Sequence, residues 1–302
     1  MGAALNSRLV WERDGMDWPH RDASRFVQAG GLRWHIQEFG KTPVKPFALL
    51  LHGTGASTHS WRGLAPLLAP HFSVLAMDLP GHGFTSMPAG GPLSPQLSLP
   101  GMAQELDALL RQLQVRPALV IGHSAGAAIA VRMCLDGLIA PQRVVSLNGA
   151  LLPLGGIAGQ VFSPVARLMA AAPFVPRLFS WRAGHPSVLR ALINGTGSRL
   201  DAEGLALYGQ LVANPGHAAG ALGMMANWDL PGLQHELPQL ATPLSLVVGE
   251  CDRTIPPRQA GRVLAMLPPA LRRPVTTLGG LGHLAHEERP ELVAQLVLAP
   301  AA

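Results

Sequence analysis

Hydrophobic residues follow two patterns that recur along the chain. Residues 32–39 (LRWHIQEF) alternate between apolar and polar side chains, which predicts a strand with one face exposed to water. Other segments begin as short, continuous apolar runs, which are typical of strands buried on both faces of a parallel sheet. These segments are residues 47–53, 72–83, 118–126, 143–149, 243–252 and 275–283.

Apolar residues with helical spacing separate these runs. Residues 101–113 (GMAQELDALLRQL) and 127–137 (AAIAVRMCLDG) show this spacing, and the second segment ends at Gly137, a residue type that commonly stops a helix. Strands that alternate with helices form a parallel sheet covered on both faces. We therefore predict an α/β protein with a mostly parallel central sheet.

The alternation stops between about residues 150 and 240. This segment has no convincing strand pattern, and prolines interrupt its short helical patches. It is too long to be a plain loop between two strands. We predict that residues 150–240 form a helical cap, inserted before the penultimate strand, and that residues 1–149 and 241–302 form the core.

Composition narrows the classes of function. Hydrophobic residues make up 48% of the 302 residues and charged residues 14%, which excludes a disordered chain. The basic residues are almost all scattered arginines, without the runs and interleaved aromatics of a nucleic-acid-binding protein. No uncharged apolar run reaches the roughly 18 residues that a membrane span needs. We expect a cytoplasmic protein that binds no nucleic acid, whose apolar balance suits peripheral contact with a membrane or a partner.

The sequence GHSAG at residues 122–126 fits the pattern G-x-S-x-G. It follows the apolar run ALVI and leads directly into a helix pattern, so Ser124 lies on a sharp strand-to-helix turn. Glycines on both sides leave room for neighbouring chain, and the turn exposes the serine hydroxyl above the sheet. The simpler interpretation is a glycine-flanked serine in a tight turn. With this context, we predict that Ser124 is a nucleophile.

A serine needs a base to accept its proton, and the base needs a carboxylate to orient it. Asp252 follows the predicted strand LSLVVGE, and His283 follows the last predicted strand and its small residues GGLG. Serine, acid and histidine then occur in the chain order expected of such a triad. Glu250 is a rival acid, but it lies nearer the strand. We predict that His283 is the base and Asp252 its partner.

His286 stands three residues after His283, so the pair could also bind a metal ion. A metal site needs a third ligand, and nothing nearby supplies one. Cys134 and Cys251 are not part of a C-x-x-C motif. We therefore predict no metal site and assign His286 a local hydrogen-bonding role.

Hydrolysis of an acyl compound also needs donors for the oxyanion. The sequence LLLHGTGAS at residues 49–57 predicts a strand followed by a glycine-rich loop. We predict that the backbone N–H groups of Thr54 and Ala125 form the oxyanion hole, although HGTG could simply be a connecting turn. This chemistry requires no metal or organic cofactor.

Together the motifs HGTG, DLPGHG, GHSAG, GECDRTIPP and GHLAHEERP resemble the α/β-hydrolase superfamily over nearly the whole chain. This resemblance implies an α/β-hydrolase fold with Ser124, Asp252 and His283 as the catalytic triad. Dehalogenases and epoxide hydrolases of this fold carry aspartate at the centre of the motif, so Ser124 argues against both. Carbon–carbon bond hydrolases and cofactor-free lyases keep the same triad and remain alternatives.

A narrower likeness involves segments of the predicted cap as well. WPHRDASRFV, HGTGASTHSWR, NGTGSRLDAEGLALYGQLV and MMANWDL resemble the BchO family, magnesium-chelatase accessory proteins of bacteriochlorophyll biosynthesis. The likeness implies a role in the tetrapyrrole branch around magnesium insertion. It also implies magnesium chelatase as a partner and an apolar substrate such as a porphyrin or chlorin.

A second hypothesis is a porphyrin-binding or chelatase-accessory protein that retains the triad without using it. The predicted cap is rich in aromatic and methionine side chains, which either line an apolar pocket for a flat ligand or pack the core of the cap. These residues are Phe162, Phe174, Phe179, Trp181, Tyr208, Met224, Met225 and Trp228. The arginines that could meet propionate groups are Arg167, Arg177, Arg182 and Arg190.

Overall fold

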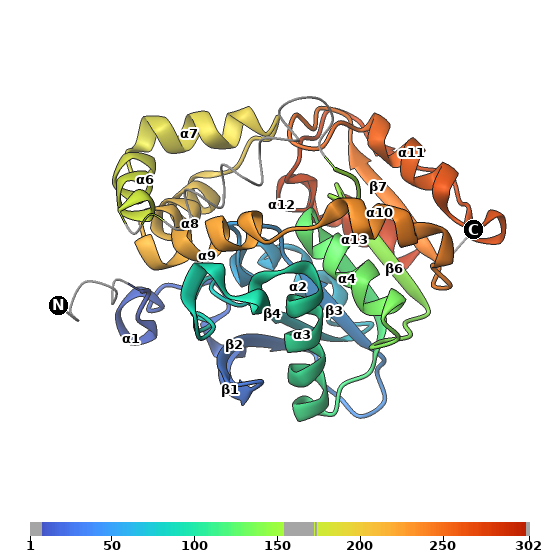
Figure 1. Ribbon diagram of the computed structural model, residues 1–302, viewed down its shortest axis with the longest axis horizontal. Helices are drawn as coiled ribbons and strands as arrows, with labels where there is room; N and C mark the ends of the chain where they lie inside the picture. The colour runs from blue at the N-terminus through green and yellow to red at the C-terminus, as the bar shows by residue number, and fades with distance from the viewer. Residues whose placement is uncertain (1–7, 154–171, 173, 300–302) are drawn as a thin grey trace.

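An eight-stranded sheet lies at the centre of the protein, with helices on both faces (Figure 1). The computed structural model describes residues 8–153, 172 and 174–299. The strand order is β1-β2-β4-β3-β5-β6-β7-β8, and every pairing from β4 through β3 to β8 is parallel. The strands are β1 (Ser24–Ala29), β2 (Leu32–Phe39), β3 (Phe47–Leu51), β4 (Ser73–Met77), β5 (Pro117–His123), β6 (Arg143–Leu147), β7 (Leu244–Gly249) and β8 (Thr276–Leu278). The predicted fold class is confirmed.

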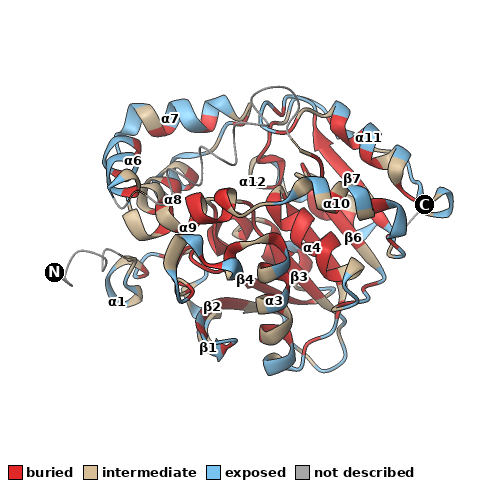
Figure 2. Cartoon of the chain, in the orientation of Figure 1, coloured by how far each residue is buried: buried red, intermediate tan, exposed pale blue. Residues whose placement is uncertain are grey.

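Two hydrophobic cores lie on the two faces of the sheet. In β3, Ala48 and Leu50 point to one core and Leu49 and Leu51 to the other, as the two-residue period of a strand requires. Figure 2 shows the central strands as buried. The long helices α3 and α4 cover one face, and α2 and α13 cover the other. The helices outside the predicted cap are α1 (Trp11–Asp14), α2 (Leu64–Leu68), α3 (Leu99–Leu113), α4 (Ala125–Leu135), α11 (Arg258–Met266), α12 (Ala285–Glu288) and α13 (Pro290–Leu298).

The amino-terminal edge of the sheet differs from the prediction in two ways. Strand β1 was not predicted, and it pairs with β2 in an antiparallel hairpin. The expectation that β2 exposes one face to water was wrong, because His35 and Gln37 on that face are buried. The Trp11 ring packs on the His35 ring, and the Gln37 amide donates to the Pro19 carbonyl at 2.7 Å. The amino-terminal segment therefore covers this face.

Between β6 and β7 the described residues form helices and no strand. They are α6 (Val175–Ala183), α7 (Pro186–Gly195), α8 (Ala202–Val212), α9 (Pro215–Ala226), α10 (Leu230–Glu236) and the 3-10 helix η5 (Leu237–Gln239). Figure 1 shows α6 to α9 gathered beyond one end of the sheet, whereas α10 returns to pack on α4. Side chains of Asp201, Asn214 and Asp229 cap α8, α9 and α10 by accepting backbone N–H groups, which favours helix starts at these positions.

The aromatic and methionine side chains of the predicted cap fall into two groups. Tyr208 and Met224 are buried, and Met225 and Trp228 are half-buried. Phe174, Phe179 and Trp181 are exposed, so packing within the cap does not account for them. Phe162 and Arg167 lie outside the described residues. In the part of the chain that the structure describes, no helix has the length and apolar character to cross a membrane.

The close approach of β3 and α4 gives a test of the fold. A Cβ atom at Gly126 would lie 2.0 Å from the Leu51 carbonyl oxygen, so Gly126→Ala should lower the free energy of unfolding by about 1–3 kcal/mol. Gly261→Ala in exposed α11 is the matched control, since a Cβ there meets no atom within 4 Å. It should raise the free energy of unfolding by about 0.5–1 kcal/mol. Urea unfolding followed by circular dichroism measures both, and equal stability of the Gly126→Ala variant and the wild type would contradict the packing.

Candidate functional site

Ser124 lies on the turn between β5 and α4, with Gly122 two residues before it and Gly126 two residues after it. Its backbone has φ 50° and ψ −116°, a conformation that costs about 1–3 kcal/mol and persists only when the surroundings enforce it. A Cβ on Gly122 would lie 2.5 Å from the Ala127 nitrogen, so the turn is too tight for a side chain there. The Ser124 N–H donates to the Leu147 carbonyl on β6 at 3.0 Å. The turn is thus held by its packing against the start of α4 and by a hydrogen bond to β6.

Asp252 and His283 come together from the loops that follow β7 and β8. His283 Nδ1 lies 2.8 Å from Asp252 Oδ2, and both residues are buried. The other carboxylate oxygen, Oδ1, accepts the backbone N–H groups of Thr254 and Ile255 at 2.8 and 2.9 Å. These bonds fix the orientation of the carboxylate, which in turn holds the imidazole.

Asn148 is a further member of this group that was not predicted. Asn148 immediately follows β6 and has a backbone φ of 49°. Its side-chain Nδ2 donates to Asp252 Oδ2 at a distance of 2.7 Å. The Asn-Gly pair after strand RVVSL signals a turn at the sheet edge but does not reveal this bond. Asn148 therefore positions the carboxylate that positions His283.

His123 connects the Ser124 turn to the histidine loop. Its Nε2 lies 2.9 Å from the His283 carbonyl oxygen, and the two imidazole rings are 4.8 Å apart. Among the described residues, no hydrogen bond joins the Ser124 hydroxyl to the His283 imidazole. The structure therefore brings Asp252 and His283 into contact and places the Ser124 turn against the His283 loop. Catalytic hydrogen bonds often tighten only when substrate binds.

Thr54 lies on the loop after β3, beside the Ser124 turn. A Cβ on the adjacent Gly53 would lie 3.0 Å from the Ser124 Cβ, which shows how closely the two segments approach. Within the described ranges, the backbone N–H groups of Thr54 and Ala125 have no acceptor in the protein. Ala125 is also the first residue of α4, where the helix dipole favours negative charge. Both N–H groups are thus free to bind an anionic oxygen.

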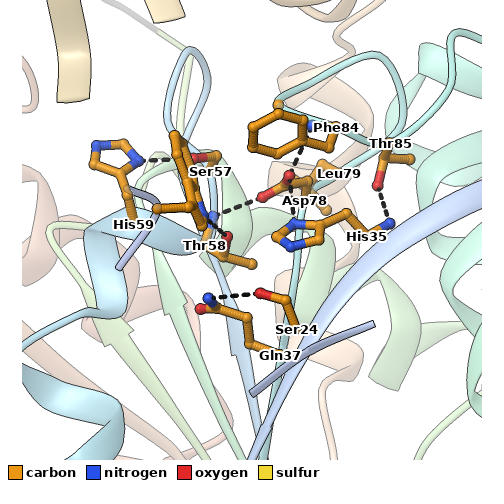
Figure 3. Close-up of polar contacts among 12 residues, drawn as sticks. Ser24, His35, Gln37, Ser57, Thr58, His59, Asp78, Leu79, Phe84 and Thr85 are labelled. Atoms are coloured by element: carbon orange, nitrogen blue, oxygen red, sulfur yellow. Dashed lines mark hydrogen bonds and ion pairs between the residues drawn. The ribbon is translucent and has the colours of Figure 1, made fainter. Parts of the chain in front are cut away.

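A buried carboxylate holds the two loops around this site (Figure 3). Asp78, just after β4, accepts the Thr58 N–H at 2.7 Å and the Phe84 N–H at 2.9 Å. Its Oδ2 also lies 2.8 Å from His35 Nδ1, and neither side chain is exposed to solvent. Burial by itself would raise the pKa of Asp78, but the charge and hydrogen bond of His35 and the Thr58 N–H outweigh it and hold the pKa well below its usual range. Asp78 thus stays ionised and fixes the loops on both sides.

His217 attaches helix α9 to these loops and was not predicted from the sequence. Its Nδ1 accepts the Gly83 N–H at 3.0 Å, so Nε2 carries the proton that goes to the Gly55 carbonyl at 3.0 Å. Burial lowers the pKa of His217 to about 4, which keeps the imidazole neutral and able to make both bonds. The Thr54 hydroxyl donates to Met224 Sδ at 3.3 Å in the same helix. Helix α9 therefore lies directly over the predicted oxyanion loop.

His286 and Glu250, the two other residues considered near the triad, do not contact the Asp252 carboxylate or the His283 imidazole through a hydrogen bond. The local hydrogen-bonding role assigned to His286 was wrong, because neither ring nitrogen has a hydrogen-bond partner among the described residues. Its ring instead packs on Trp61 and His123, and burial lowers its pKa to about 3. Glu250, the rival acid, is exposed and accepts the Gly280 N–H at 2.9 Å, away from His283. No cluster of metal-ligating side chains occurs in the described ranges.

Glu287 connects the loop of His283 to helix α8. Its buried carboxylate accepts from the Tyr208 hydroxyl at 2.8 Å and from Arg62 Nη1 at 2.9 Å. Arg62 also binds Asp201, the residue that caps α8, at 2.9 Å. Burial raises the pKa of Glu287 to about 7, against the opposing effect of Arg62. This network ties the helices after β6 to the segment that carries the candidate base.

Comparison with known proteins agrees with the resemblance seen in the motifs. A family model described as the alpha/beta hydrolase family matches residues 48–296. The chain is 38% identical over 282 residues to the magnesium-chelatase 30 kDa subunit of Rhodobacter capsulatus, with 93% of this chain and 95% of that protein covered. It is also 38% identical to a fluoroacetate dehalogenase from Burkholderia sp, but over only 41% of this chain and 38% of that protein.

Solved structures show the same architecture. An alpha/beta hydrolase fold protein from Burkholderia ambifaria superposes with a TM-score of 0.74 at 25% identity, covering 92% of this chain and 97% of that one. A thermophilic esterase from Thermogutta terrifontis superposes with a TM-score of 0.68 at 20% identity, covering 91% and 96%. The second likeness concerns the fold alone.

The buried Glu287 gives a prediction about pH. Between its ordinary pKa of 4.5 and about 7, the native state holds a proton that the unfolded chain has released, so stability falls as pH rises. Relative to Glu287→Gln, the wild type should lose on the order of 3 kcal/mol of unfolding free energy between pH 4.5 and 8. Urea unfolding at a series of pH values measures the difference. Glu291→Gln on the exposed side of α13 is the control, and identical pH slopes for wild type and Glu287→Gln would refute the prediction.

Proposed function

Because the chain belongs to the alpha/beta hydrolase family, we propose that it is a serine hydrolase that cleaves an ester or a related carbonyl compound. The observation that carries the proposal is the 2.8 Å contact between His283 Nδ1 and Asp252 Oδ2 beside the strained Ser124 turn. An imidazole whose Nδ1–H is held by a carboxylate presents Nε2 as an acceptor. This is the form that takes a proton from a serine hydroxyl.

The reaction proceeds in two halves. Ser124 Oγ attacks the carbonyl carbon while His283 Nε2 takes the hydroxyl proton, and the N–H groups of Thr54 and Ala125 bind the oxyanion. The intermediate collapses, and His283 gives its proton to the leaving alcohol, which leaves the acyl group on Ser124. Water then attacks this ester as His283 accepts its proton. The second collapse releases the acid, and Ser124 regains its proton from His283.

The substrate class and the setting are part of the proposal. The likeness of the motifs to the BchO family is the basis for a role in bacteriochlorophyll biosynthesis near the magnesium-chelatase step. The R. capsulatus relative, a magnesium-chelatase subunit, supports magnesium chelatase as a partner. An apolar small molecule such as a porphyrin or chlorin suits that setting. We assign residues 150–240 to a cap over a core of residues 1–149 and 241–302, which the contacts of His217 with Gly55 and of Tyr208 with Glu287 support. The protein would work in the cytoplasm, in peripheral contact with a membrane.

Covalent labelling tests the nucleophile. A fluorophosphonate probe should label the wild type at one residue, Ser124, and should not label Ser124→Ala. His283→Ala should slow labelling by a factor on the order of 10²–10⁴, because the serine loses its base. Asn148→Ala should slow it roughly tenfold, since the variant loses one hydrogen bond to a charged group. Mass spectrometry of the peptide and the time course of labelling measure these effects.

Ser187→Ala removes an exposed serine of α7 and serves as the matched control, with labelling at the wild-type rate. An intact, folded wild type that the probe does not label at Ser124 would sink the hydrolase proposal. Equal rates for the wild type and His283→Ala would exclude His283 as the base.

The likeness to the magnesium-chelatase subunit of R. capsulatus favours one alternative, a chelatase-associated protein that performs no hydrolysis. Deletion of the gene in its host, followed by complementation with Ser124→Ala, separates the two functions. Under the hydrolase proposal the variant fails to restore pigment synthesis at normal protein level, and an esterified or otherwise uncleaved intermediate accumulates. Full rescue by Ser124→Ala would favour the non-catalytic function, and titration with Mg-protoporphyrin would then reveal binding as a spectral shift.

A further inference from the structure

Helix α6 (Val175–Ala183) has its large apolar side chains on the outside. Phe174, which immediately precedes the helix, is 64% exposed, and Leu178 and Trp181 within it are 58% and 77% exposed. The buried residues of the same helix are the small Pro176, Ser180 and Ala183. A helix of a water-soluble domain normally buries its large apolar residues and exposes polar ones. The reversal in α6 therefore points to a partner that the outward face meets.

The exposed apolar residues form one stripe. With about 3.6 residues per turn, positions 174, 178 and 181 share one face of the helix, and positions 177 and 182 fall on either side of it. Arg177 and Arg182 occupy these two flanking positions, and both are exposed. The next helix, α7 (Pro186–Gly195), packs on α6 and adds exposed Arg190 and the partly exposed Leu192. Figure 2 shows the outer sides of both helices as exposed.

The charged side chains of α6 and α7 have one sign. The sequence contains no aspartate or glutamate between Asp136 and Asp201, whereas it contains six arginines in that interval. The exposed surface of α6 and α7 therefore carries positive charge without a neighbouring carboxylate on either helix. This charge complements an anionic surface that also accepts apolar side chains.

A bilayer with anionic lipids combines these two properties. Large apolar side chains of an interfacial helix enter the boundary between headgroups and acyl chains, and tryptophan favours this depth. Arginine stems extend along the apolar layer while their guanidinium groups reach the phosphates. We propose that α6 docks on the surface of a membrane containing anionic lipids, with Phe174, Leu178 and Trp181 inserted and Arg182 and Arg190 at the headgroups.

The docking face lies one helix away from the candidate site. Val175 of α6 packs beside Leu222 and Ala226 of α9, the helix whose His217 and Met224 contact the oxyanion loop. A protein docked through α6 would hold its candidate site close to the bilayer, where an apolar substrate concentrates. The inference thus names a partner for the proposed hydrolase, but the docking itself does not depend on hydrolysis.

Vesicle flotation tests the docking. The whole protein is mixed with phosphatidylcholine vesicles, with or without phosphatidylglycerol, and the fraction that floats is measured. We expect flotation only with the anionic vesicles, reduced by added salt. Leu178→Ser combined with Trp181→Ser should weaken binding roughly tenfold or more, because both side chains lose their apolar burial. Val44→Ser, at a residue that is 89% exposed elsewhere, is the apolar control and should bind like the wild type.

The contribution of charge has its own pair of variants. Arg182→Gln combined with Arg190→Gln should weaken binding to anionic vesicles, whereas Arg116→Gln combined with Arg258→Gln removes the same net charge elsewhere and should not. All variants are also labelled with the fluorophosphonate probe without vesicles, and they should react at the wild-type rate. Failure of docking and failure of hydrolysis are therefore separate results.

Three outcomes would overturn the proposal. In the first, the wild type does not float with anionic vesicles. In the second, the Leu178→Ser and Trp181→Ser changes leave flotation unaltered. In the third, the α6 face joins two copies of the chain, which sedimentation in the absence of lipid would reveal as a dimer that the same changes dissociate.

Discussion

The close contact between the end of β3 and the first turn of α4 determines the geometry of the site. There is room only for a hydrogen atom where Gly126 meets the Leu51 carbonyl. Because α4 must begin at this distance from the sheet, the chain turns within one residue, and Ser124 takes a positive φ. The same contact brings the loop after β3 beside the Ser124 turn, as the close approach of Gly53 to Ser124 shows. The strain at Ser124, about 1–3 kcal/mol, is small beside the apolar surface buried in the two cores that enforce it.

Around this turn, burial sets the charge of the polar side chains, and it acts in opposite directions on acids and bases. Burial lowers the pKa of His217 and His286, so the unfolded chain binds more protons than the native state as pH falls below 6.5, and stability decreases. Burial raises the pKa of Glu287, so its contribution to the free energy of unfolding decreases as pH rises toward 7. Since two histidines oppose one glutamate, the net effect of these three groups is loss of stability in acid. At neutral pH the buried imidazoles of His217 and His286 are therefore uncharged.

The sequence was sufficient for features that depend on local pattern. Continuous apolar runs identified the parallel strands, and glycines around Ser124 identified the turn, because both follow from backbone geometry within a few residues. Asn148 and His217 were missed because each acts on a residue far away in the chain, Asp252 and Gly55. The prediction for His286 was wrong for the same reason, since the Trp61 ring that packs on it belongs to a distant part of the sequence. That Asp252 and His283 are catalytic remains a prediction, to which the structure adds their contact.

The helices between β6 and β7 have opposite chemistry on their two sides. The side toward the core makes specific polar contacts, through His217 with the Gly55 carbonyl and through Tyr208 with Glu287. The outer side, formed by α6, presents Phe174, Leu178 and Trp181. Polar contacts of fixed geometry hold these helices in one place against the core loops, whereas apolar contact with a fluid layer needs no fixed geometry. A segment with this division of roles suits both proposals, because it stays rigid toward the proposed reaction site while its outer side is free to meet a non-polar phase.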